Sequence, residues 1–112
     1  MELLGITRVV ANVERSKEFY EGVLGFKPDA YYEPTHWQSY KIQEGMFFAV
    51  GEAPGSTHEN AFTVDDVEAL WDKIKDKVEV VHPLEKTPWG TYRFVIQDPD
   101  GNLLAFGQKQ AG

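Results

Sequence analysis

The sequence predicts an α+β fold in which a βαβββ module occurs twice and forms a curved mixed sheet around a cavity, with the helices on the outside. Two observations support this prediction. Signals for a strand, a helix and three further strands follow one another in the first half of the chain, and the same order begins again near the midpoint. The two expected helix starts, Asn12 and either Asp65 or Asp66, lie 53 or 54 positions apart in a chain of 112 residues. This spacing indicates an internal duplication.

The first half of the chain contains the signals of module one. Residues 3–11 are apolar and β-branched enough to form a strand. Asn12 is a typical helix N-cap, and the apolar spacing that follows predicts a helix over residues 13–24. Gly25, followed by the apolar Phe26, is typical of a Schellman-type helix end. Three strands are then expected to complete the module, over residues 29–33, 37–43 and 46–51.

The second half begins after a polar linker over residues 52–57, which contains both proline and glycine. At this length the chain forms one domain, with module one at about residues 1–51 and module two at about residues 58–112. Asp65 is expected to cap the second helix, with Glu68 three residues later completing a capping box. The helix follows a strand over residues 58–64, and its buried stripe is expected to consist of Val67, Leu70, Trp71, Ile74 and Val78.

The end of the chain predicts a sharply specified hairpin. Asp98, Pro99, Asp100 and Gly101 suit the successive positions of a type I turn that is followed by a glycine bulge. The flanking segments are β-branched, aromatic or apolar, which predicts strands over residues 79–84, 91–97 and 103–108.

Composition limits the classes of function. The net charge is −7, and the basic residues are scattered along the sequence, so we do not expect nucleic acid as a partner. No apolar run is long enough to span a bilayer, and the N-terminus lacks the pattern of a secretion signal, so we expect a cytoplasmic protein that does not enter membranes. Without cysteine, the chain has neither disulfides nor thiolate metal sites.

Three motifs connect the chain to a known family. They are residues 12–26, which contain the Phe19-Tyr20 and Val23–Phe26 patterns, residues 61–67, and residues 98–102. Together they resemble the vicinal oxygen chelate superfamily, which includes glyoxalases, bleomycin-resistance proteins and extradiol dioxygenases. The resemblance covers nearly the whole chain and implies paired βαβββ modules around a cup, usually in a homodimer. It does not specify an activity.

Many members of this superfamily hold a divalent metal in the cup, and the resemblance identifies the positions where the ligands would be expected. The positions of the first-strand histidine, the second-module histidine and the final glutamate hold Gly5, Glu59 and Ala105. The remaining carboxylate would fall near Phe48 or Ala49, neither of which can bind a metal. Because a catalytic metal needs about three protein ligands, the sequence predicts no metal-ligating and no catalytic residues of the family type, and no cofactor.

Aromatic and charged residues are the candidates for ligand binding. Trp37, Tyr40, Trp89 and Tyr92 are expected to form an aromatic wall that favours flat or cationic ligands. Trp89 follows Pro88 and precedes Gly90, and this element resembles one that forms the ligand groove of bleomycin-resistance proteins. Glu59 could pair with a cationic ligand, although the sequence does not settle whether His58 or Glu59 faces the cavity. Arg93 could meet an acidic ligand or pair with a carboxylate of the chain.

These residues favour one function and leave two others open. The favoured function is that of a metal-free, bleomycin-resistance-type protein that sequesters an aromatic or cationic ligand, such as an antibiotic, in the groove of a homodimer. The alternative is a metal-dependent glyoxalase-like lyase or isomerase, or a dioxygenase, whose divalent metal is held by a relocated set such as His36, His58 and Glu59. The third possibility is a structural or regulatory domain whose cup is filled by side chains.

Overall fold

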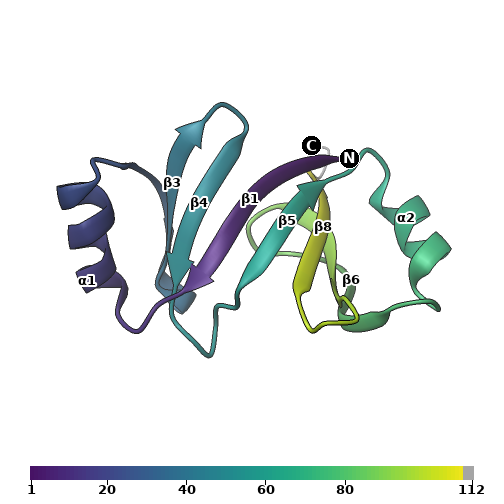
Figure 1. Cartoon of the computed structure of the whole chain (residues 1–112). Helices are drawn as coiled ribbons and strands as arrows, with labels where there is room; N and C mark the ends of the chain where they lie inside the picture. The colour runs from purple at the N-terminus through teal and green to yellow at the C-terminus, as the bar shows by residue number, and fades with distance from the viewer. Residues whose placement is uncertain (110–112) are drawn as a thin grey trace. The chain divides into compact units, whose positions relative to one another are not determined.

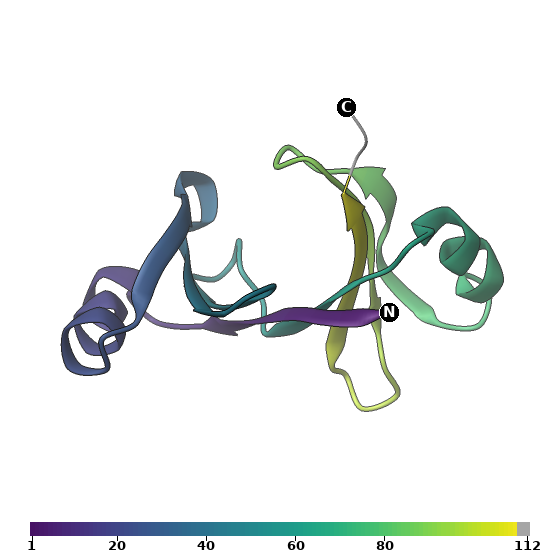
Figure 2. The ribbon, with the colours of Figure 1, turned by 90° about the horizontal axis from the view of Figure 1, so that it is seen from above.

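The computed structural model describes residues 1–109 and divides into two compact units. One unit is Leu4–Glu59, and the other is Met1–Leu3 together with the chain from Asn60 onward. Each module has four strands and one helical segment between its first two strands, and each helix lies along one face of the sheet of its own module (Figures 1 and 2). The α+β class and the two βαβββ modules are therefore confirmed.

Module one has its strands in the order β2-β3-β4-β1. Strand β1 pairs with β4 in parallel, whereas β3 pairs with both β2 and β4 in antiparallel fashion. A short 3-10 turn, η2, connects β2 and β3. The elements are β1 (Glu2–Val9), α1 (Val13–Lys17), η1 (Glu18–Val23), β2 (Lys27–Tyr32), η2 (Glu33–Thr35), β3 (Trp37–Gln43) and β4 (Met46–Gly51).

Module two repeats this arrangement, because its strands follow the order β6-β7-β8-β5. In both modules the first strand therefore lies beside the fourth, and the helix crosses between the first and second strands. This shared order is the structural counterpart of the repeat seen in the sequence. The elements are β5 (Glu59–Thr63), α2 (Val67–Ile74), β6 (Glu79–Lys86), β7 (Thr91–Gln97) and β8 (Leu103–Lys109).

The first helix begins as predicted and ends in an unexpected form. Asn12 accepts a hydrogen bond at Oδ1 from the Arg15 backbone N–H, at 2.9 Å. From Glu18 onward the helix widens into the π-helical segment η1. Gly25 ends it at a φ of 74°, as expected of a C-terminal glycine, but the Phe26 N–H donates to the Tyr20 carbonyl at 2.9 Å. That bond spans one residue more than a Schellman motif, because the preceding turn is itself wide.

The N-cap of the second helix is Asp66, so the prediction of Asp65 was wrong by one residue. Asp66 accepts a hydrogen bond at Oδ1 from the Ala69 N–H at 3.0 Å, which leaves an alanine at the position where a capping box needs Glu or Gln. The Val67 N–H donates to Gln108 Oε1 at 2.7 Å. This bond connects the first turn of α2 to strand β8, and no local sequence signal specifies it.

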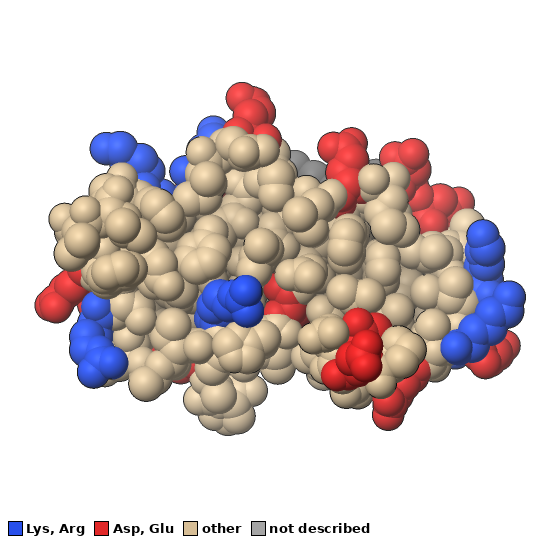
Figure 3. Space-filling view, viewed as in Figure 1, with Lys and Arg blue, Asp and Glu red and all other residues tan. Residues whose placement is uncertain are grey.

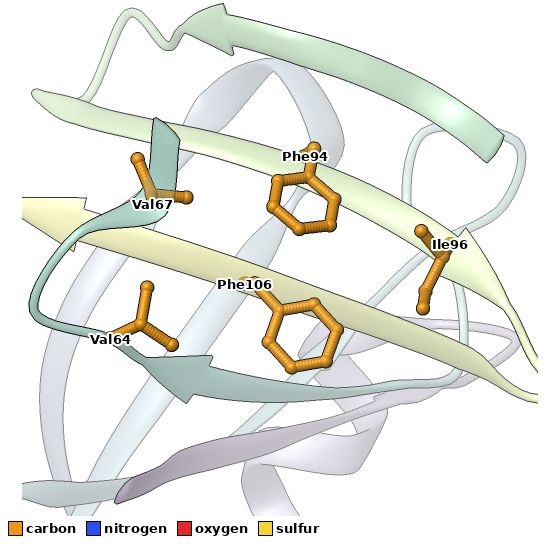
Figure 4. Packing of buried hydrophobic residues seen from close by; sticks show 5 residues of the cluster. All are labelled: Val64, Val67, Phe94, Ile96 and Phe106. Carbon is orange, nitrogen blue, oxygen red and sulfur yellow. The ribbon is translucent and has the colours of Figure 1, made fainter. Parts of the chain in front are cut away.

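A hydrophobic core lies under each helix. In module two, α2 covers a cluster formed by Val64, Val67, Phe94, Ile96 and Phe106 (Figure 4). The other members of the predicted stripe, including Trp71, pack against this cluster, so the amphipathic reading of α2 is confirmed. In module one, the buried cluster consists of Val13, Tyr40 and Val50.

The final hairpin has the predicted turn. The Gly101 N–H donates to the Asp98 carbonyl at 3.0 Å, and Gly101 has a φ of 89°, which glycine adopts readily. The Asp98 carboxylate also accepts hydrogen bonds from the Asn102 side chain at 3.0 Å and from the Asn102 and Asp100 backbone N–H groups at 2.9 Å. These bonds, that from the Asn102 side chain foremost, lower the pKa of Asp98 from its ordinary value.

The surface is acidic overall, with charges of both signs interspersed. On the face shown in Figure 3, the Lys and Arg side chains lie apart from one another and form no continuous patch. Within residues 1–109, no helix has both the length and the apolar character needed to cross a bilayer.

Candidate functional site

Trp89 is presented on a tightly bonded turn between β6 and β7. The Thr87 N–H donates to the Thr91 carbonyl at 2.8 Å, the Thr91 N–H donates to Thr87 Oγ1 at 3.0 Å, and the two hydroxyls lie 2.7 Å apart. Gly90 closes the turn at a φ of 93°, where an L-residue would be strained. Trp89 remains 53% exposed on this turn. The turn that carries Trp89 is therefore ordered by hydrogen bonds, and about half of the Trp89 residue is exposed.

Arg93 extends over the ring of Trp89. Its guanidinium carbon lies 5.3 Å from the centroid of the Trp89 ring, within the range of a cation–π contact. In register, Arg93 stands opposite Gly107 on β8 and opposite Glu85 on β6. A Cβ at Gly107 would lie 3.4 Å from the Cβ of Arg93, which is an ordinary van der Waals distance. The structure thus brings two of the predicted site residues together.

Tyr92 lies on the other face of the sheet from Arg93, because adjacent strand residues point in opposite directions. It packs against the core cluster of module two. Partial burial and the nearby Glu68 carboxylate of α2 raise the pKa of Tyr92 above its ordinary value. The expectation that Tyr92 forms a ligand wall with Trp89 is therefore corrected: its ring faces the helix.

Trp37 lies on the face of module one opposite the helix. Its indole Nε1 donates to Thr7 Oγ1 at 3.2 Å, and its ring meets the Phe47 ring edge-on, with centroids 5.6 Å apart. Thr7 is buried and Trp37 is half-buried. The indole N–H of Trp37 is thus already bonded to Thr7, and one side of the ring contacts Phe47. The rest of the ring remains accessible.

Tyr40 was expected beside Trp37, but it lies on the opposite face of β3. The two residues are three positions apart in a strand with a two-residue period, so they cannot share a face. Tyr40 is fully buried between the sheet and the first helix, and its hydroxyl donates to Glu21 Oε2 at 2.9 Å. Burial and this hydrogen bond raise the pKa of Tyr40 far above its ordinary value. The expected ligand role of Tyr40 is therefore wrong, and the residue belongs to the core.

The alternation of side chains along β5 also shows which of His58 and Glu59 points away from the helix. Phe62 packs against the core cluster under α2, so Glu59, three positions earlier, points to the opposite face of β5. The carboxylate Oε2 of Glu59 accepts a hydrogen bond from Thr57 Oγ1 at 3.1 Å. His58 precedes the strand and accepts the Val9 N–H at Nδ1, at 3.1 Å. Of His58 and Glu59, Glu59 is therefore the residue whose side chain lies on the face of β5 away from α2.

The residues at the expected metal positions do not fit a metal of the family type. At Gly5, a Cβ would lie 2.6 Å from Cγ of Phe47, because the Phe47 ring covers the place where a first-strand ligand would project. Ala105 is buried and stands opposite Val95 in register. Neither Gly5 nor Ala105 has a donor atom in its side chain, so of these positions only Glu59 offers one, whereas a catalytic site needs about three.

The relocated ligand set is not assembled within the described part of the chain. His36 has a left-handed backbone, with a φ of 49°, and its Nδ1 lies 3.1 Å from the Tyr31 hydroxyl. The Nδ1 of His58 is engaged by the Val9 backbone. Within residues 1–109, no group of three or more His, Asp or Glu side chains is arranged to hold a metal ion.

An open pocket of about 250 Å³ lies at one end of the module one sheet. It is somewhat smaller than typical small-molecule sites, which enclose about 300–1,000 Å³. None of the six predicted ligand residues lines it; its lining consists of Leu4, Asp29, Lys41, Gln43, Gly45, Met46 and Phe47. Trp89 and Arg93 are therefore not part of the lining of this pocket.

Two residues that matter to these sites were missed in the sequence. Phe47 covers Gly5 only because β1 and β4 are parallel neighbours in that register, and no local pattern specifies such a pairing. Glu85 stands opposite Arg93 in register. The charged residues of β6 do not alternate, so only the pairing with β7 assigns Glu85 to this position.

Comparison with known proteins agrees with this architecture. The profile of the Glyoxalase/Bleomycin resistance protein/Dioxygenase superfamily matches residues 3–106. A superfamily member from Vibrio splendidus 12B01 is 20% identical, with a TM-score of 0.78 over 93% of this chain and 96% of that one. A hypothetical protein from Bacillus halodurans C-125 has 17% identity and a TM-score of 0.81, over 99% and 96% of the two chains.

The methylmalonyl-CoA epimerase of Streptomyces coelicolor is also similar, with 19% identity and a TM-score of 0.77, over 99% of this chain and 96% of that one. At these identities the three structures show a common fold and do not indicate a common activity. No curated protein matches the chain.

Proposed function

This chain belongs to the glyoxalase/bleomycin resistance protein/dioxygenase superfamily, and from that premise we propose that it is a metal-free binding protein of the bleomycin-resistance type. It holds a small aromatic molecule by stacking and electrostatic contact, without covalent chemistry. The observation that supports the proposal most strongly is the half-exposed Trp89 ring on its hydrogen-bonded turn, with the Arg93 guanidinium 5.3 Å from the ring centroid. An aromatic side chain on a turn that is already ordered allows a flat ligand to stack without the cost of ordering a loop.

The side chains at the metal positions support the same proposal. Gly5 is covered by the Phe47 ring, and Ala105 offers no donor atom. A reaction of the family's metal-dependent kind would need ligands that these two positions do not supply. A homodimer that completes the groove, as the superfamily resemblance implies, is part of the proposal, and light scattering of the purified protein tests it.

Elemental analysis tests the metal-free part of the proposal. Protein purified without chelators is expected to contain well under one equivalent of Ni, Zn, Mn or Fe per chain. Stoichiometric metal that is lost in the Glu59→Ala variant would support the metal-dependent alternative instead.

Ligand titration tests the binding part. The probes are small naphthalene derivatives, measured by isothermal calorimetry, because a two-ring system matches the indole in size. Trp89→Ala is expected to weaken binding about tenfold, which corresponds to the loss of one aromatic contact. Phe19→Ala is the matched control, because Phe19 is another half-exposed aromatic, at 50%, and lies on the first helix. Equal effects of the two substitutions would show that Trp89 is not part of the site.

A further inference from the structure

We propose that the pocket at the end of the module one sheet is a second ligand site, which takes a small zwitterion with an apolar tail, such as an aliphatic amino acid. The pocket has a volume of about 250 Å³, and its lining combines an acidic residue, a basic residue and an apolar wall. These residues are Asp29, Lys41, Leu4, Met46 and Phe47. The site goes beyond the proposed function and does not depend on it, because neither Trp89 nor Arg93 belongs to its lining.

A β-bulge places Asp29 in the lining of the pocket. Strand β2 has one residue more than β3 at this point, because Asp29 and Ala30 together stand opposite Ser39. Two buried side chains bond the backbone of Ala30: its N–H donates to Ser39 Oγ at 3.0 Å, and its carbonyl accepts from Gln38 Nε2 at 3.1 Å. A bulge whose backbone is satisfied by buried polar side chains is a specified feature, of the kind that re-aims a side chain beside a binding site.

Lys41 provides the positive charge of the pocket. It lies on the face of β3 away from the helix, as Trp37 does, because the two residues are four positions apart. Lys27 stands opposite Lys41 in register, and like charges in this position repel each other. An anionic group bound beside the two ammonium groups reduces that repulsion, so the carboxylate of the ligand is placed at Lys41.

The charges of Asp29 and Lys41 are not compensated by the protein. In the part of the chain that the structure describes, neither side chain makes a hydrogen bond or an ion pair, either with the other or with a further residue. A ligand with a single charge would pair with only one of them. A zwitterion offers an ammonium group to the Asp29 carboxylate and a carboxylate to the Lys41 ammonium group.

The apolar wall determines the kind of tail that fits. The Phe47 ring meets the Trp37 ring edge-on, with centroids 5.6 Å apart, and the Gln43 amide donates to Met46 Sδ at 3.2 Å. Both wall residues are therefore in contact with neighbours inside module one. A flexible thioether beside an aromatic ring adapts well to an aliphatic chain. The volume is below that of sites for drug-sized ligands, which favours a short chain over a large ring system.

Three probes with similar aliphatic tails separate the possibilities: L-leucine, isocaproate, which lacks the ammonium group, and isoamylamine, which lacks the carboxylate. Titration of the full chain is followed by the chemical shifts of the backbone amides in NMR spectra. Leucine is expected to bind about fivefold more tightly than either analogue, which corresponds to one ion pair with an exposed side chain. The largest shifts are expected in residues 28–30 and 41–47, and none in residues 87–93.

Two nearly isosteric substitutions test the two charges separately. Asp29→Asn is expected to weaken leucine binding about fivefold without weakening isocaproate binding, since isocaproate has no ammonium group to lose. Lys41→Gln is expected to weaken leucine binding to the same extent without weakening isoamylamine binding. Asp76→Asn and Lys86→Gln are the matched controls, because they remove exposed charges of the same kind from module two, and leucine binding is expected to stay unchanged in both.

Thermal unfolding establishes that each variant is folded, and the comparison of the three probes on the wild type decides the matter even where a variant is not. Isocaproate or isoamylamine binding as tightly as leucine would overturn the assignment of a zwitterion. Shifts confined to residues 87–93, or equal losses in the control variants, would overturn the site. If leucine causes no shifts at millimolar concentration, the inference is wrong, whereas the naphthalene titration remains an independent test of the proposed function.

Discussion

Replacing Gly5 with alanine is expected to destabilise the protein, because the added methyl group has no space. Its Cβ would lie 2.6 Å from Cγ of Phe47, a ring atom next to the backbone that cannot move away as a flexible chain end could. The outer side of the ring is held by the edge contact with Trp37, whose centroid is 5.6 Å away. Overpacking of this kind costs about 1–3 kcal/mol in free energy of unfolding.

Replacing Gly22 with alanine is instead expected to raise the free energy of unfolding. Gly22 lies in the helical segment η1, and a Cβ there would meet no atom within 4 Å. Alanine is preferred to glycine in a helix interior by about 0.5–1 kcal/mol, since it restricts the unfolded chain. Gly22→Ala is therefore the matched control for Gly5→Ala.

Urea unfolding followed by circular dichroism gives both free energies from the midpoint and slope. The double variant Gly5→Ala with Phe47→Leu is expected to recover at least half of the loss caused by Gly5→Ala, because the smaller side chain vacates the contact. A coupling free energy of at least about 0.5 kcal/mol between the two positions would confirm the steric origin. Equal effects of Gly5→Ala and Gly22→Ala, or strict additivity with Phe47→Leu, would refute the reasoning.

Three further substitutions test other contacts. Tyr40→Phe removes the hydroxyl that donates to Glu21 at 2.9 Å and is expected to cost about 1–2 kcal/mol in urea unfolding, because the half-exposed Glu21 partly regains hydration; an unchanged midpoint would contradict a stabilising bond. The pKa of Asp98 is lowered, chiefly by the Asn102 side chain, so its contribution to stability is complete above the ordinary value of 3.8 and is lost as the pH falls below it. The urea midpoint of Asp98→Asn should therefore fall less steeply than that of the wild type between pH 5 and about pH 2.5, and parallel curves would rule this out. Phe94→Ala empties a fully buried site beneath α2 and is expected to cost about 3–5 kcal/mol, measured in the same way; a loss below about 1 kcal/mol would show that the core collapses around it.

The parts of the fold that could be predicted are those that local chemistry determines. The Asn12 cap, the Gly25 helix end and the turn from Asp98 to Gly101 depend on residues next to one another in the chain, and all three are present. Asp65 was the predicted cap of the second helix, whereas Asp66 is the cap, and the Val67 N–H next to it is bonded to Gln108 of β8. Such a bond follows only from the tertiary structure.

The candidate site was less predictable, because it depends on which face each side chain occupies. Trp37 and Tyr40 lie three positions apart, so strand parity alone excludes a common face. Tyr92 and Arg93 are neighbours, and parity separates them in the same way. Parity does not specify which residue of a pair faces the helix, and that assignment required the core contacts. The Arg93 contact with Trp89 depends in addition on the shape of the turn.

The Phe47 ring over Gly5 also restricts the routes by which the sequence can change. A histidine introduced at position 5 first meets the ring, so the substitution that would restore a metal ligand is destabilising unless Phe47 is replaced before it. Replacing Phe47 first removes the edge contact with Trp37 and leaves the space empty. Each order of single substitutions passes through a less stable intermediate. Placing a metal ligand at position 5 thus requires two dependent substitutions, each of which alone gives a less stable protein.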